Sequence, residues 1–119
     1  MSWIKITDTD QIPFREGRSV KLGRHEVAIF NLGDRFAAMD NKCPHSGGPL
    51  CDGIVTGDAD GFAVVCPLHG WKISLENGNI LRPQVPVCVE LYPVKVESGI
   101  IQIQFPDTMQ STENKEVAA

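Results

Sequence analysis

Two short stretches, Cys43-Pro44-His45 and Cys66-Pro67-Leu68-His69, decide how this chain must fold. Each stretch offers one thiolate and one imidazole, so together they supply two Cys and two His side chains. This donor set can bind a 2Fe–2S cluster in which two imidazoles replace two of the usual thiolates. Because all four donors must reach one centre, the fold has to bring the two loops side by side.

The residues around the candidate ligands are suited to tight loops. Pro44 and Pro67 fix φ directly after each Cys and remove one N–H group. Gly47-Gly48 and Gly70 permit positive φ and a close approach of the backbone, so that amide N–H groups can point at a cluster. Such donors stabilise added negative charge and therefore tune a reduction potential. We expect Pro49-Leu50 to keep water from one side of the site.

The rest of the sequence predicts short β-strands separated by turns. Strand patterns cover residues 3–6, 19–22, 26–32, 35–39, 62–65, 71–75, 87–91, 92–96 and 100–105. The dipeptides Gly33-Asp34, Asn77-Gly78 and Ser98-Gly99 can join neighbouring strands as hairpins. No stretch shows a helical period of useful length. The predicted fold class is therefore all-β, a small antiparallel β-sandwich or barrel with two cluster-binding loops.

Length and composition agree with a single globular domain. The chain has 119 residues, of which 42% are hydrophobic and 22% are charged, and its net charge is −4. We expect residues 1–105 to form the domain and the polar, aperiodic residues 106–119 to form a disordered tail. Lys and Arg form no run that would favour nucleic acid or an anionic membrane. There is no apolar run of the roughly 20 residues that cross a bilayer and no signal-peptide pattern, so we expect a cytoplasmic protein.

The other notable side chains are predicted to have structural roles. Cys51 and Cys88 have apolar neighbours, which favours small buried side chains or unpaired thiols over a disulfide in a reducing compartment. His25 is expected to be a solvated residue at a turn. Trp71 and Trp3 are expected to fill the core.

At the two ligand loops the chain resembles the Rieske family of 2Fe–2S domains. The Cys-x-His and Cys-x-x-His motifs match, and so does the continuation into Gly70-Trp71. The resemblance implies that the cluster is bound by four residues, with the thiolates on the inner iron and the imidazoles on the outer, more exposed iron: Cys43, His45, Cys66 and His69.

Two departures place the likeness in the lower-potential, ferredoxin-like branch of this family. Respiratory Rieske proteins carry a further Cys in each loop and join the two in a disulfide, but Leu68 occupies the second-loop position here, which leaves Cys51 without such a partner. Those proteins also carry a hydroxyl residue soon after the second His, where this chain has Trp71.

Within this branch the chain is similar to the small subunit of assimilatory NAD(P)H-dependent nitrite reductases. The likeness is carried by residues 3–6, 41–50, 53–58, 71–78 and 92–96. It implies an electron-transfer subunit of an oxidoreductase in nitrate assimilation. That subunit is not catalytic alone and joins a large subunit with flavin, an iron–sulfur cluster and sirohaem that reduces nitrite to ammonium. The sequence agrees that a partner is needed, because it contains no dinucleotide Gly fingerprint, P-loop or nucleophile–base set.

Two alternatives stay open. The first is a free-standing Rieske ferredoxin that feeds an aromatic-ring dioxygenase. The second is a non-redox structural subunit whose site is empty or holds zinc, because Cys₂His₂ is also a common zinc set. Zinc fingers usually pair Cys with Cys and His with His in the sequence, whereas each loop here mixes the two, which favours iron and sulfur.

Overall fold

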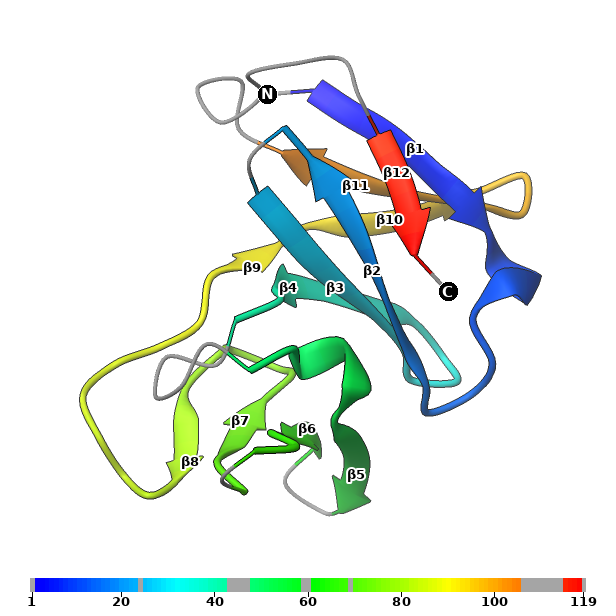
Figure 1. The fold of residues 1–119 in the computed structure, drawn as a ribbon. Helices are drawn as coiled ribbons and strands as arrows, with labels where there is room; N and C mark the ends of the chain where they lie inside the picture. Colours follow the sequence, from blue (N-terminus) through cyan, green and yellow to red (C-terminus); the bar gives the residue numbers. More distant parts are fainter. Residues whose placement is uncertain are drawn as a thin grey trace.

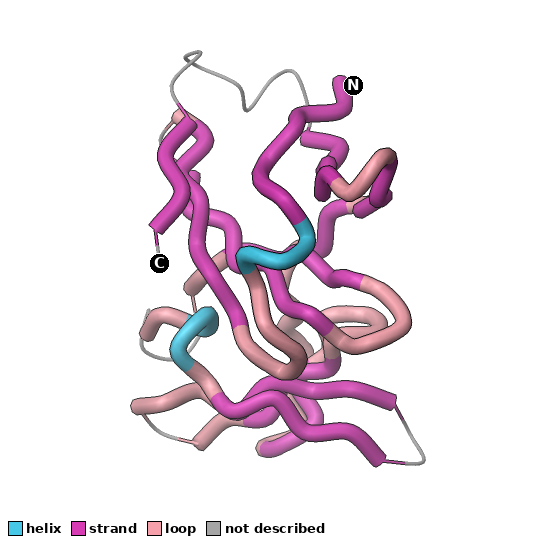
Figure 2. Tube along the Cα trace, turned by 90° about the vertical axis from the view of Figure 1, so that its right-hand side faces the viewer, coloured by secondary structure: helices cyan, strands magenta, loops and turns pink. Residues whose placement is uncertain are grey.

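The computed structural model describes residues 2–23, 25–42, 48–58, 61–68, 70–105 and 115–118. Within these ranges the chain is built from strands and two short 3-10 turns, Thr9–Gln11 and Leu50–Asp52, shown in cyan in Figure 2. No helix in the described ranges is long and apolar enough to cross a membrane. The strands are β1 (Ser2–Asp8), β2 (Gly17–Leu22), β3 (His25–Asn31), β4 (Phe36–Asp40), β5 (Ile54–Asp58), β6 (Gly61–Val65), β7 (Lys72–Ser74), β8 (Ile80–Arg82), β9 (Leu91–Tyr92), β10 (Val94–Glu97), β11 (Ile100–Phe105) and β12 (Lys115–Ala118).

These strands form three antiparallel sheets, which confirms the all-β prediction. The strand orders are β1-β11-β10, β12-β2-β3-β4-β9 and β5-β6-β7-β8. Figure 1 shows the first two sheets packed together in the upper part of the molecule and the four-stranded sheet below them. Figure 2 shows the same division from the side.

The position of β3 explains why its sequence is apolar at consecutive positions. Successive side chains of a strand point to opposite faces. Val27 and Ile29 enter a core that they share with β1 and β11, whereas Ala28 and Phe30 enter a second core that they share with β5, β6 and β7. All four side chains are at most 1% exposed. Because both faces of β3 are buried, its apolar run is continuous and not alternating.

The predicted hairpin turns are present. Gly33 lies between β3 and β4 with φ 95°, and Gly78 lies between β7 and β8 with φ 81°. Ser98 and Gly99, between β10 and β11, both have positive φ. At Gly78 the backbone approach is also close, since an added Cβ would lie 2.2 Å from the Val89 carbonyl oxygen.

Two strand predictions need correction. Residues 87–91 do not form a strand of their own, because their backbone groups bond to separate elements. Cys88 forms an isolated bridge with Asn79, and the carbonyl of Glu90 accepts the Asp40 N–H. The predicted strand 92–96 is divided into β9 and β10, because Pro93 between them has no N–H to donate.

Further differences lie at β5, at β8 and in the tail. β5, which contains Gly57, and β8 are not among the predicted strands. Of the tail that was predicted to be disordered, Lys115–Ala118 form β12 and pair with β2. This pairing covers β2, which would otherwise be an edge strand with unpaired N–H and C=O groups. Residues 106–114 lie outside the described ranges.

Candidate metal centre

One of the four predicted ligands, Cys66, lies within the described residues, whereas Cys43, His45 and His69 lie outside them. Cys66 directly follows the end of β6 and is 2% exposed. It contributes to the core between β3 and the four-stranded sheet. The sheet therefore places this sulfur at the end of a strand and away from bulk water.

The first loop leaves the end of β4 and returns to the same place. Lys42 and Pro49 form an isolated antiparallel bridge across its base. The Leu50 N–H donates to the Asn41 carbonyl at 3.4 Å. Leu50 is fully buried and Pro49 is exposed; the expectation that the pair keeps water from the site stays a prediction.

Asn41 anchors this base through its side chain. It is 2% exposed; its Nδ2 donates to Glu26 Oε1 at 2.8 Å, and its Oδ1 accepts the Cys51 N–H at 2.7 Å. The first bond connects Asn41 to β3, and the second connects it to the 3-10 turn that follows the first loop. Sequence reasoning did not identify this role; the available signal was a polar Asn just before a ligand loop.

The second loop is closed by its own backbone. The Cys66 N–H donates to the Trp71 carbonyl at 2.8 Å, and the Gly70 N–H donates to the Cys66 carbonyl at 3.1 Å. Gly70 has φ 73°, as its predicted role in the turn requires. Trp71 is partly buried and packs against the core beside the four-stranded sheet. The loop is therefore held in a compact turn that begins at Cys66.

The described ends of the two loops are in contact. A Cβ added to Gly48, at the end of the first loop, would lie 2.9 Å from Leu68 Cδ1 and 3.3 Å from Cys66 Sγ, both on the second loop. Gly48 is buried. A shared cluster needs this arrangement, and the buried sulfur with a glycine backbone against it fits a cluster ligated by Cys66.

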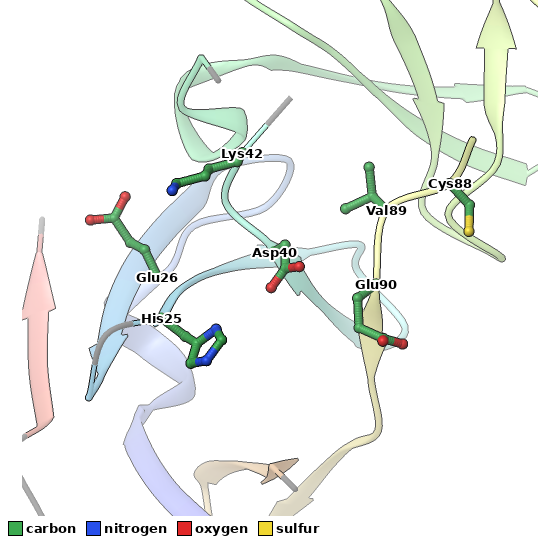
Figure 3. A pocket seen from close by; sticks show the side chains of 7 residues that line it. All are labelled: His25, Glu26, Asp40, Lys42, Cys88, Val89 and Glu90. Carbon is green, nitrogen blue, oxygen red and sulfur yellow. The ribbon is translucent and has the colours of Figure 1, made fainter. Parts of the chain in front are cut away.

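A cleft of about 340 Å³ lies beside the base of the first loop. Figure 3 shows its lining side chains: His25, Glu26, Asp40, Lys42, Cys88, Val89 and Glu90. His25 is half-buried at the start of β3, not a fully solvated turn residue as expected. Cys88 is an exposed, unpaired thiol, so the second of the two roles expected for it holds and the first, a buried side chain, does not.

Cys51 is half-buried and, like Cys88, is not disulfide-bonded, as expected. Burial and the neighbouring Asp52 carboxylate raise the pKa of the Cys51 thiol. A raised pKa keeps this sulfur protonated at neutral pH, and a protonated thiol is a poor metal ligand and nucleophile. Cys51 is therefore distinct from the buried sulfur of Cys66 that faces the first loop.

Comparison with known proteins agrees with this geometry. Residues 2–104 match the model of the Rieske-like [2Fe-2S] domain family. The chain is 37% identical over 103 residues to the ferredoxin component of the alkene monooxygenase system of Xanthobacter autotrophicus, a match that covers 87% of this chain and 81% of that protein.

Two further relatives belong to nitrite reductases. The chain is 34% identical over 102 residues to the nitrite reductase [NAD(P)H] large subunit of Klebsiella oxytoca, which covers 85% of this chain and 11% of that protein. A crystal structure assigned to an NADH-dependent nitrite reductase small subunit of Mycobacterium tuberculosis matches with a TM-score of 0.78 and 29% identity, over 86% of this chain and 93% of that one. The all-β fold, the two juxtaposed loops and the family match together establish that this chain belongs to the Rieske-like [2Fe-2S] domain family.

Proposed function

We propose that this chain is an electron-transfer subunit that holds a Rieske 2Fe–2S cluster through Cys43, His45, Cys66 and His69. The observation that carries the proposal is the contact of Gly48 with Leu68 and Cys66 Sγ, because it brings the two motif loops to one place. When bound, the cluster supplies reversible one-electron chemistry. The chain itself supplies the ligands, the buried position of Cys66 and the closed loops that hold them.

The ligand set suits an electron carrier. Two neutral imidazoles in place of two thiolates make the site less negative than an all-Cys site, which raises the reduction potential. The backbone hydrogen bonds that close the loop from Cys66 to Trp71 would limit movement of the sulfur between redox states. A site that changes little in geometry needs little reorganisation on gaining or losing an electron.

We further propose that the chain is the small subunit of an NAD(P)H-dependent nitrite reductase and works in the cytoplasm. The match to the Mycobacterium tuberculosis structure, over nearly all of both chains, supports this assignment. So does the Rieske-like stretch within the nitrite reductase large subunit of Klebsiella oxytoca. The partner would be a large subunit with flavin, an iron–sulfur cluster and sirohaem, which would take the pyridine nucleotide and reduce nitrite to ammonium.

A second candidate function is the ferredoxin component of an oxygenase system. The observation that favours it is the 37% identity to the Xanthobacter ferredoxin component, across 81% of that protein. In this role the same domain would carry electrons to a separate oxygenase.

The cluster is tested by spectroscopy on the purified full chain. Wild type should be coloured and, after reduction, should give the EPR signal of a 2Fe–2S centre. Cys66→Ser should abolish both signals, whereas the matched control Cys51→Ser should retain them because Cys51 lies outside the two motifs. A colourless, EPR-silent wild type with one zinc per chain would overturn the proposal.

The partner is tested by reconstitution. Addition of the chain to its cognate nitrite reductase large subunit should support NAD(P)H-dependent formation of ammonium from nitrite, and Cys66→Ser should not. If the chain has no effect there but restores product formation in an oxygenase assay with a reductase, the second candidate function is correct.

A further inference from the structure

Leu68 and Gly48 form the described contact that joins one ligand loop to the other. The bridge between Lys42 and Pro49 closes the first loop on itself, and the bond from Cys66 to Trp71 closes the second. Neither bond crosses from loop to loop. The packing of Leu68 on Gly48 does cross, since a Cβ at Gly48 would lie 2.9 Å from Leu68 Cδ1 and 3.0 Å from Leu68 Cγ.

Space, and not backbone conformation, requires glycine at position 48. Gly48 is not among the residues with positive φ, so a left-handed backbone is not the reason for glycine here. An added Cβ would, however, lie too close to Leu68 Cδ1, at 2.9 Å, and within 3.3 Å of Cys66 Sγ. The missing side chain therefore lets the first loop lie directly against both the sulfur and Leu68.

Exposure shows which of the three residues faces water. Cys66 is 2% exposed and Gly48 is buried, whereas the side chain of Leu68 is 57% exposed. Leu68 thus lies on the solvent side of the contact, with its inner face on Gly48. An exposed Leu is by itself unremarkable, but this one covers the point where the two loops meet beside the sulfur.

We propose that Leu68 is a positioning residue, which clamps the two ligand loops together on Gly48 and excludes water from Cys66 Sγ. Water that donates a hydrogen bond to a ligand sulfur stabilises the more negative, reduced state of a cluster and so raises its potential. Leu68 therefore keeps the potential low and slows loss of the cluster. The inference rests on the proposed function, because it requires Cys66 to be a ligand.

The first test compares substitutions of Leu68 on the cluster-loaded chain. Leu68→Ala and Leu68→Asn should shift the midpoint potential upward and accelerate cluster loss to a chelator several-fold, whereas Leu68→Met, which restores apolar cover, should behave like wild type. Val96→Ala is the matched control, because Val96 is 47% exposed on β10, in a different sheet. Val96→Ala should leave the midpoint potential and the rate of cluster loss unchanged. An unshifted potential in Leu68→Ala and Leu68→Asn would overturn the inference.

The second test is a double-mutant cycle. Gly48→Ala should reduce cluster content, because the new methyl group collides with Leu68 and crowds the sulfur. In a Leu68→Ala background the same change should cost less, since one of the two collisions is gone. Additive losses would show that positions 48 and 68 act independently and would also overturn the inference.

The two proposals fail in distinguishable ways. A wild-type chain that binds no cluster refutes the ligand assignment and the role of Leu68 with it. A wild-type chain that binds a cluster, beside Leu68 variants that match it in potential and in the rate of cluster loss, refutes the role of Leu68 alone. Circular dichroism of each variant shows whether the fold is retained.

Discussion

The hydroxyl of Tyr92 donates a 2.6 Å hydrogen bond to Asp40 Oδ1, which joins β9 to the end of β4. Tyr92 is 5% exposed. Burial, together with the hydrogen bond to the Asp40 carboxylate, raises the pKa of Tyr92 far above its ordinary value. Asp40 lies in the cleft beside the first loop (Figure 3), so this bond fixes the strand from which the loop starts.

This bond predicts a loss of stability at alkaline pH. Above about pH 10 an unfolded chain gives up the Tyr92 proton while the folded chain keeps it, so the unfolded state binds fewer protons. The stabilisation is complete below that pH and falls above it, by up to about 1.4 kcal/mol per pH unit. Urea unfolding from neutral to alkaline pH should show a steeper fall for wild type than for Tyr92→Phe. Parallel pH profiles would contradict the assignment.

The Asn41 anchor predicts a local weakness at the base of the first loop. Asn41→Ala leaves the half-buried N–H of Cys51 without its acceptor and Glu26 without its donor, which should cost about 2 kcal/mol of unfolding free energy. The variant should also lose its cluster faster. Gln11→Ala, at an exposed position outside these bonds, is the control and should match wild type. Equal stability of both variants would refute the anchor.

Alanine substitutions at two turn glycines should separate the energetic cost of backbone strain from that of steric overlap. Gly78 and Gly99 have similar φ values of 81° and 75°, but a Cβ at Gly78 would lie 2.2 Å from the Val89 carbonyl oxygen, whereas at Gly99 it would meet nothing within 4 Å. Gly99→Ala should cost about 1 kcal/mol from the left-handed conformation alone. Gly78→Ala should cost about 3 kcal/mol or more. Thermal unfolding measures both, and similar losses would show that the backbone near Val89 yields easily.

The ion pair of Glu76 with Arg35 should make a salt-dependent contribution to the free energy of unfolding. Glu76 forms this pair with Arg35 at the turn between β3 and β4, and its Oε2 accepts the Phe62 N–H at 2.9 Å. Because Arg35 is 42% and Glu76 35% exposed, Glu76→Gln should cost about 0.5 kcal/mol at low salt. At about 1 M salt the difference should disappear. Asp34→Asn, which removes the 74% exposed partner of the same Arg35, should have no measurable effect.

Sequence patterns predicted the elements whose signals are local. The hairpin of β3 and β4 follows from an apolar run, a Gly-Asp turn and a second run, and Gly70 takes the positive φ expected of it. Cys66 lies at the end of the predicted strand 62–65 and is buried. The ligand roles of all four residues, Cys43, His45, Cys66 and His69, stay predictions.

Features that depend on distant partners could not be read from the sequence. Residues 87–91 look like a strand, but residues 88–90 make only single bonds, to Gly78 and Asn79 in the turn between β7 and β8 and to Asp40 at the end of β4. Only Leu91 joins a ladder, as part of β9. Trp3 was expected in the core, but it is 38% exposed, and Lys95 Nζ lies 4.6 Å from its ring centroid. The two lie on strands that both pair with β11, a neighbourhood that no local pattern encodes.

The double-sided burial of β3 has a consequence for how the molecule comes apart. Since adjacent residues of one strand are divided between both cores, neither core can lose its packing while the other keeps it. We therefore expect a single cooperative denaturation transition in which bleaching of the cluster colour coincides with the disappearance of the β-sheet circular dichroism signal.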